Sequence, residues 1–157
     1  MSRGKIVLAT GAFDLLHLGH VRFLEASKRR GGRGAKLVVV VARDKTVLDR
    51  KGQLPILPES QRRELVGSLR AVDKAILGHT HLDLLGILTE VRPDIISLGY
   101  DQKQIKASVR KLLKKERLNI RIVQIPKFGA HGLNSSTGIK TRVAKRWPDQ
   151  AKLRRAL

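Results

Sequence analysis

Two histidines lie three residues apart near the start of the chain, in the stretch GAFDLLHLGH at 11–20. This spacing places the side chains of His17 and His20 on one side of the first turn of a helix. Gly19 leaves no side chain between the two rings, and Gly11 lets the backbone approach a ligand closely. Two imidazole donors aimed at one point suit phosphoryl or nucleotidyl transfer, because charge develops there on phosphate oxygens.

Two plainer interpretations of the histidine pair stay open. A histidine at the start of a helix is often structural, and the two rings could ligate a metal together with Asp14. A zinc site needs further ligands, and the chain has no cysteine and no second His/Glu cluster nearby. The sequence therefore assigns no metal-ligating residue.

The elements that must position these residues follow from alternating apolar and helical patterns. Strands are expected at 5–11, 35–42, 71–77, 93–99 and 119–125, and helices near 18–30, 59–70, 81–91 and 104–117, with a last helix from about Ser136 that stops before Pro148. This alternation predicts an α/β fold: one doubly wound, Rossmann-like domain with a five-stranded parallel sheet and helices on both faces. Ligands bind at the carboxyl edge of such sheets, where the amides of helix N-termini favour phosphate.

Composition limits the class of protein. The chain has 157 residues and is 41% hydrophobic, which suits one domain over 1–157 with a basic tail at about 148–157. Without cysteine it holds no disulfide, and the apolar run at 37–42 is too short to cross a bilayer. We expect a soluble, cytoplasmic protein with no membrane partner.

The charge is strongly positive and uneven along the chain. Lys and Arg number 33 against 13 Asp and Glu, and residues 101–157 hold 16 basic and 3 acidic residues. Such a surface attracts phosphate-bearing partners, whether nucleotides or nucleic acid. Aromatic residues make up only 3% of the chain, so few side chains could stack on the bases of a single-stranded nucleic acid.

Longer motifs carry a resemblance to a known family. GAFDLLHLGH is similar to the G-[TS]-F-D-x-x-H-x-G-H signature of the cytidylyltransferase-like nucleotidyltransferases, and SSTGIK at 135–140 resembles their second signature, [ST]-[ST]-[ST]-x-I-[KR]. Within that superfamily the chain most resembles the archaeal FAD synthases, themselves similar to glycerol-3-phosphate cytidylyltransferase. The stretches that carry this closer resemblance are VVARDKTV at 40–47, PILPESQRRELVGSLRAVDKAILG at 55–78 and PDIISLGYDQ at 93–102. Ala12 stands where the family usually has Thr or Ser, so a hydroxyl contact is absent and only the backbone of Ala12 can contact the nucleotide.

The resemblance implies a reaction and its substrates. AMP would pass from ATP to the phosphate of FMN and release pyrophosphate, with Mg²⁺ or another divalent cation, in an enzyme that is often a homodimer. One alternative is a cytidylyltransferase acting on glycerol 3-phosphate or another small phosphorylated alcohol. Another is a non-catalytic, basic nucleic-acid-binding protein built on the same fold.

The resemblance also implies a set of site residues. His17 and His20 would be catalytic, and the nucleotide-binding set would be Gly11, Ala12, Phe13, His17, Leu18, Gly19, His20, Lys51, Arg62, Arg70, Asp101, Phe128, Ser136 and Lys140. In this set Lys51 would stand in a loop and Phe128 would contact a ring. Each has a structural alternative: Arg62 and Arg70 as a solvated helix face, and Ser136 as part of a helix cap.

Two further expectations concern acid groups and pH. Asp14 and Asp73 are interpreted as structural. If the histidines donate to phosphate, the rate should titrate near neutrality.

Overall fold

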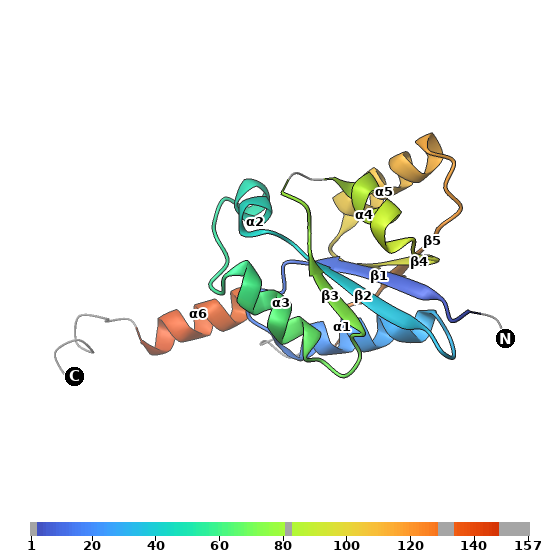
Figure 1. Ribbon diagram of the computed structural model, residues 1–157. Helices are drawn as coiled ribbons and strands as arrows, with labels where there is room; N and C mark the ends of the chain where they lie inside the picture. Colours follow the sequence, from blue (N-terminus) through green and yellow to red (C-terminus); the bar gives the residue numbers. More distant parts are fainter. Residues whose placement is uncertain (1–2, 81–82, 129–133, 148–157) are drawn as a thin grey trace.

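The computed structural model describes residues 3–80, 83–128 and 134–147, in which all strands pair in parallel (Figure 1). The strands are β1 (Ile6–Gly11), β2 (Lys36–Val41), β3 (Lys74–Leu77), β4 (Ile95–Gly99) and β5 (Arg121–Ile125), in the order β3-β2-β1-β4-β5. The helices are α1 (Leu18–Arg30), α2 (Asp44–Lys51), α3 (Glu59–Gly67), α4 (Leu84–Val91), α5 (Lys103–Lys115) and α6 (Ser136–Arg146). The predicted α/β class and five-stranded parallel sheet are confirmed.

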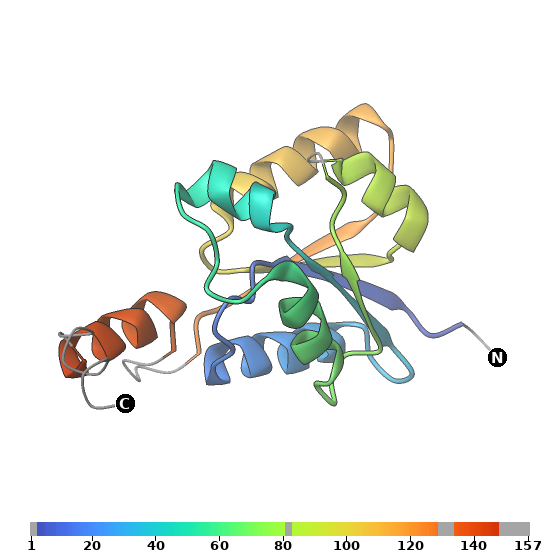
Figure 2. The same cartoon turned by 60° about the vertical axis from the view of Figure 1, so that its left-hand side comes forward.

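Helices cover both faces of the sheet because its strands are apolar on both sides. Val7 and Ala9 of β1 pack in a core with Leu24 of α1 and Val66 of α3. Leu8, between them, faces a second core formed with α4 and α5. In Figures 1 and 2, α1 and α3 lie on one side of the sheet and α4 and α5 on the other.

The strand order reverses beside β1, which pairs with β2 on one side and with β4 on the other. Chains leave the carboxyl ends of β1 and β4 toward opposite faces of the sheet. A crevice at such a switch point is where doubly wound folds bind ligands. The turn that carries the two histidines follows β1 directly, so it lies at this crevice.

One helix was not predicted from the sequence. Residues 44–51 form α2, so Lys51 ends a helix rather than standing in a loop, and Gly52 follows it in a left-handed conformation with φ 72°. The segment DKTVLDRK buries only Val47, and one apolar residue gives no periodic stripe to recognise. The third helix also ends earlier than expected, at Gly67, which leaves Arg70 beyond it.

The last helix, α6, extends away from the carboxyl edge of the sheet (Figures 1 and 2) and buries none of its residues. Its N-cap is Ser135, whose hydroxyl accepts a hydrogen bond from the Gly138 amide at 3.0 Å. The expected basic tail at about 148–157 lies outside the described residues. Within the described part of the chain, no helix combines the length and apolar character needed to span a bilayer.

Candidate functional site at the carboxyl edge of the sheet

A cavity of about 580 Å³ opens at the switch point between β1 and β4. Its size falls within the roughly 300–1,000 Å³ typical of small-molecule sites. It brings together ten of the residues expected from the sequence: Gly11, Ala12, Phe13, His17, Gly19, His20, Lys51, Asp101, Phe128 and Ser136. These residues come from the ends of β1 and β4, from α1 and α2, and from the segments on either side of 129–133.

The two histidine rings stack on each other inside this cavity. Their centroids lie 3.8 Å apart with 25° between the ring planes. A Cβ atom added at Gly19 would lie 2.9 Å from the ring of His17, so glycine is needed there for the stack to form. Nδ1 of both rings is enclosed and has no hydrogen-bond partner among the described residues.

Burial favours the neutral form of both histidines in this structure. Loss of solvent lowers the pKa of His17. For His20, burial together with the neighbouring His17 and Lys51 lowers the pKa to about 3, against a weaker opposing effect of Asp14. The expected titration of the rate near neutrality stays a prediction; in the free protein the pKa of each ring lies below its ordinary value.

The loop between β1 and α1 adopts an unusual conformation at Phe13. This residue has φ 51°, in the left-handed region, and its ring is buried with its centroid 5.3 Å from that of His20. A Cβ atom at Gly11 would lie 2.8 Å from the Phe13 ring. Gly11 thus makes room for the aromatic ring that supports His20.

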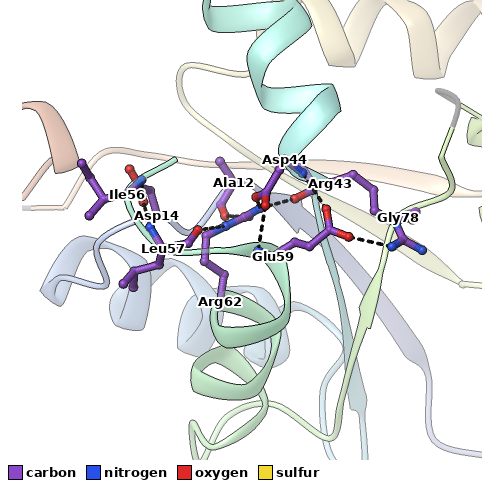
Figure 3. Close-up of polar contacts among 10 residues, drawn as sticks. Ala12, Asp14, Arg43, Asp44, Ile56, Leu57, Glu59, Arg62 and Gly78 are labelled. Atoms are coloured by element: carbon purple, nitrogen blue, oxygen red, sulfur yellow. Dashed lines mark hydrogen bonds and ion pairs between the residues drawn. The ribbon is translucent and has the colours of Figure 1, made fainter. Parts of the chain in front are cut away.

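Arg62 holds this loop from beneath (Figure 3). Its side chain is 0% exposed, and its guanidinium donates to the carbonyls of Ala12, of Ala42 at 2.8 Å and of Leu57 at 2.9 Å. It also pairs with Asp44 at 2.5 Å. Ala12 and Ala42 directly follow β1 and β2, so one buried cation joins the ends of two strands. Arg62 is therefore not part of a solvated face.

A second network fixes the start of α2 and α3 (Figure 3). The amide of Asp44 donates to the Glu59 carboxylate at 2.7 Å, and the amide of Glu59 donates to the Asp44 carboxylate at 3.2 Å. Each helix start is thus capped by the acidic side chain of the other. Arg43 bonds to Glu59 at 2.7 Å and to the carbonyl of Gly78 at 2.7 Å. This anchoring directs α2 and its terminal Lys51 toward the cavity.

Asp14 ties the same loop to two other segments. Its carboxylate accepts hydrogen bonds from the amides of Ile56 at 2.7 Å and Leu57 at 3.1 Å, and pairs with Lys140 of α6 at 2.7 Å. Burial alone would raise the pKa of Asp14, but Lys140 and the two amides outweigh burial and lower it. These contacts fit the structural interpretation of Asp14, although its side chain also lines the cavity.

Asp73 has an equivalent role far from the cavity. It accepts a hydrogen bond from the amide of Leu37 at 2.7 Å and pairs with Lys28 at 2.8 Å. The structural interpretation of this residue fits its contacts as well.

Four expected residues do not line the cavity: Leu18, Arg62, Arg70 and Lys140. Leu18 is exposed, and Arg62 and Lys140 are engaged as described above. Arg70 lines a separate hollow of about 420 Å³ together with Lys28 and Gly34, near the amino end of β2.

Sequence reasoning also missed residues that the structure brings to the site. Arg43, Thr46 and Arg50 line the cavity because α2 was not foreseen. Gln102 bridges the two strands of the switch point by donating to the carbonyl of Thr10 at 3.1 Å and accepting from the amide of Gly99 at 2.7 Å. The segments VVARDKTV and PDIISLGYDQ contain Arg43, Thr46 and Gln102, but the sequence did not mark these side chains as site residues, and Arg50 lies outside both segments.

No metal centre formed by protein alone is present in the described ranges, since no three His, Cys, Asp or Glu side chains gather there at ligating distance. A divalent cation that arrives with phosphate groups needs no such cage, because Mg²⁺ keeps several waters and is usually held by substrate phosphates and one or two carboxylates. Asp101 of the cavity wall is a carboxylate whose described surroundings include no ion pair.

A doubly wound sheet with a stacked histidine pair at its first strand–helix turn defines a class, the nucleotidyltransferases of cytidylyltransferase-like architecture. The family model described as cytidylyltransferase-like matches residues 8–142. Proteins named FAD synthase match at 44% identity in Thermoplasma volcanium, over 87% of this chain and 92% of that protein, and at 46% in Thermoplasma acidophilum, with the same coverage. One from Methanobrevibacter smithii is 42% identical over 90% of this chain and 92% of its own length.

Solved structures share this fold. A crystal structure of a Thermoplasma volcanium protein described as a lipopolysaccharide core biosynthesis protein superposes with TM-score 0.72 at 46% identity, covering 80% of this chain and 98% of that one. An Archaeoglobus fulgidus protein of unknown function, 23% identical, shares the fold with TM-score 0.58. The chain belongs to the cytidylyltransferase-like family of nucleotidyltransferases, on the branch of the archaeal FAD synthases.

Proposed function

We propose that this protein transfers AMP from ATP to the phosphate of FMN, which yields FAD and pyrophosphate. The observation that carries this proposal is the pair of stacked imidazoles in a cavity at the switch point. The relatives named FAD synthase support the choice of substrates.

In this reaction a phosphate oxygen of FMN attacks the α-phosphorus of ATP. The bond from that phosphorus to the oxygen bridging to the β-phosphate breaks, and pyrophosphate leaves with the bonding electrons. No covalent enzyme intermediate is needed. The protein must align the two phosphates and stabilise the charge that grows on the α-phosphate and on the leaving group.

The histidines supply neutral donors for this charge. Because Nδ1 of each ring is enclosed, Nε2 is the nitrogen left to donate a hydrogen bond to an oxygen of the α-phosphate. Removal of one well-aimed donor of this kind typically costs about 3–4 kcal/mol of barrier. Lys51, at the end of α2, supplies positive charge for the departing pyrophosphate.

The backbone around the histidines adds further donors. α1 has no acidic residue in its first turn, so its N-terminal amides favour a phosphate. The carbonyl of Ala12 faces Arg62, and in a trans peptide the amide of Phe13 must then point away from Arg62. That amide has no hydrogen-bond partner among the described residues.

The remaining cavity residues suit the nucleoside and the metal. Asp101, after β4, and Phe128, after β5, line the cavity and would contact the ribose and base of ATP, and Ser136 at the start of α6 would contact the phosphates. Mg²⁺ or another divalent cation would accompany the triphosphate and neutralise part of its charge. Asp101, a carboxylate that lines the cavity, would share such an ion.

The test is a substrate matrix with purified protein. ATP and CTP are each offered with FMN and with glycerol 3-phosphate in the presence of Mg²⁺, Mn²⁺ or Co²⁺, and products are separated by chromatography. We expect FAD and pyrophosphate from ATP with FMN, and a loss of about 10²–10³-fold in His17→Asn and His20→Asn. CTP turnover with glycerol 3-phosphate, or no FAD with any of the metals, would contradict the proposal.

A further inference from the structure

The edge of the sheet at which the strands begin, opposite the cavity, is densely basic. We call it the amino edge; it is formed by the segments that lead into the five parallel strands, namely 3–5, 28–36, 70–74, 92–94 and 114–121. These segments hold 14 Lys and Arg residues against 3 Asp and Glu, an excess of 11. All of these cations except Lys28 are exposed. In Figure 1 the α1–β2 and α5–β5 connections lie at the end of the sheet where the chain enters β1.

The opposite edge, which carries the cavity, has no such excess. The segments that leave the strands at that edge are 12–20, 42–59, 78–83, 100–103 and 126–136. Their described residues include 6 Lys and Arg and 6 Asp and Glu. The positive charge of the amino edge therefore does not serve the nucleotide in the cavity.

The three carboxylates of the amino edge are already engaged within the protein. Their ion pairs are Asp94–Arg3 at 3.6 Å, Asp73–Lys28 at 2.8 Å and Glu116–Lys115 at 3.7 Å. Among the described residues, the other cations of this edge have no acidic partner within ion-pair distance. Like charges gathered in this way repel one another, and a bound polyanion relieves that repulsion.

Helix dipoles account for only part of this charge. Both α1 and α5 end at the amino edge with basic residues in the last turn, where they face the negative end of the helix dipole. In contrast, α3 and α4 end there without one, yet Arg70, Lys74 and Arg92 follow them. Four helix ends contribute roughly two negative charges in all, since each is worth about half a charge. That is small beside the positive excess of this edge.

A hollow of about 420 Å³ lies within the amino edge, between the end of α1 and the connection from α3 to β3. The charged side chains that line it are Glu25, Lys28, Arg29 and Arg70. Glu25 pairs with Arg22 at 3.0 Å. Gly32 and Gly34 also line the hollow at φ 81° and 73°, and a Cβ atom at either position would meet nothing within 4 Å. Open backbone beside exposed guanidinium groups suits a phosphate.

We propose that the amino edge binds the phosphate backbone of double-stranded nucleic acid, with one phosphate seated in the hollow. This function is separate from the transfer of AMP. Neighbouring strands lie about 4.8 Å apart, so the five strands span roughly 19 Å of this edge. The same length of duplex carries about 11 phosphate charges, with both strands counted. The charge on the nucleic acid thus has the same size as the positive excess that faces it.

The composition of the amino edge favours a duplex over other polyanions. Its segments contain no Phe, Tyr or Trp, so no side chain there could stack on the bases of a single strand. A membrane surface requires apolar anchors, and the one large hydrophobic side chain exposed in these described segments is Leu118, at 37%. A duplex backbone requires neither feature, because ionic contacts to phosphate bind it without regard to sequence.

The experiment measures duplex binding as a function of salt. Fluorescence anisotropy follows a labelled 20-bp duplex of DNA, and in a second arm of RNA, from 50 to 300 mM KCl. We expect the logarithm of the affinity to fall against the logarithm of the salt concentration with a slope of about −4 or steeper, which corresponds to about four or more phosphate contacts. The arm with the tighter binding identifies which of the two duplexes supplies the backbone.

Two triple variants locate the contact. Arg29→Gln, Arg33→Gln and Lys74→Gln together remove three exposed charges from the amino edge. Lys45→Gln, Arg63→Gln and Arg142→Gln make the same change in net charge at exposed positions elsewhere. We expect the first variant to lose at least about tenfold in duplex affinity and about 2–3 units of slope, and the second to change less than about twofold. Any rate of FAD formation should be equal in the wild type and the amino-edge variant.

Other outcomes would overturn the inference. Equal losses in the two triple variants would mean that the duplex responds only to the net charge of +20. Tighter binding of a single strand than of the duplex, or binding of phosphatidylserine vesicles without binding of the duplex, would assign the edge to another partner. Displacement of the duplex by ATP would place the duplex in the cavity. All of these are binding measurements, so they are independent of whether the protein makes FAD, and circular dichroism shows that each variant is folded.

Discussion

Acid should destabilise this protein through His20, beginning near pH 6.5, before the carboxylates start to titrate. In the folded state its pKa is about 3, because the ring is buried beside His17 and Lys51. In the unfolded chain the ring has its ordinary pKa of about 6.5. Between these two values the unfolded state binds a proton that the folded state does not, so stability falls as pH falls from 6.5 toward 3.

The size of the effect follows from the shift. A pH of 4.5 lies two units below the ordinary pKa of about 6.5, so protonation of this ring in the unfolded state costs roughly 3 kcal/mol of stability relative to pH 7. This is a large share of the 5–15 kcal/mol that holds a typical domain folded. The lowered pKa also matters for chemistry, because a neutral imidazole at pH 7 still has one N–H group that can donate a hydrogen bond.

Urea unfolding at pH 7, 6, 5 and 4.5 measures this directly in the wild type and in His20→Gln. The glutamine side chain keeps a polar group in place but cannot titrate. Its stability should decline with acid by roughly 3 kcal/mol less than that of the wild type over this range. Asp14, Glu59 and Asp73, whose pKa values are lowered, are common to both proteins and cancel in the difference. Parallel declines in the two proteins would refute the buried, neutral state of His20.

Three further predictions follow from individual contacts. Arg62→Met should cost roughly 3–5 kcal/mol of stability and weaken ATP binding, because the carbonyl of Ala12 and the Asp44 carboxylate lose their buried partner. Arg63→Met, at the exposed neighbouring position, is the control. Equal urea midpoints for the two variants would show that the buried contacts of Arg62 do not stabilise the protein. Gly19→Ala should lower kcat about 10²-fold with little change in thermal stability, because the new Cβ would lie 2.9 Å from the ring of His17 and displace it; an unchanged kcat would mean that the stack is not needed. Lys140→Met should raise the pKa of Asp14 measured by carboxyl NMR, because burial is then opposed by two amides alone; a constant value would show that α6 does not hold this carboxylate.

The sheet was predictable because its signals are local. Runs such as LVVVV at 37–41 are apolar on both sides, which is how a strand buried between two helix layers must be composed. The histidine motif was equally clear, since strand, glycine and helix start fall within ten residues. The helix α2 gave no such signal, because eight mostly polar residues with a single buried valine do not form a stripe. Its formation depends on Glu59, which caps it from 15 residues away.

Side-chain environment was the part that the sequence could not give. Arg62 stands in the polar run QRRE, where Arg63 is exposed and Arg62 is fully buried. The difference arises because three backbone carbonyls and Asp44 converge on one position of α3, and only a long planar cation with several donors can satisfy all of them. The low pKa of His20 has a similar origin, since it arises first from burial of the ring by the fold, with His17 and Lys51 adding to the effect.

These buried charges explain how a short loop can be stiff enough for catalysis. The loop after β1 has no regular secondary structure, and Phe13 is held at a positive φ that it would not adopt freely. Arg62 fixes its first carbonyl, Asp14 joins it to residues 56–57 and to α6, and the Phe13 ring supports His20. A donor must lie within a fraction of an ångström of its place to stabilise a transition state. The Phe13 ring and two buried ionic side chains, Arg62 and Asp14, therefore hold the loop of the phosphate site in place.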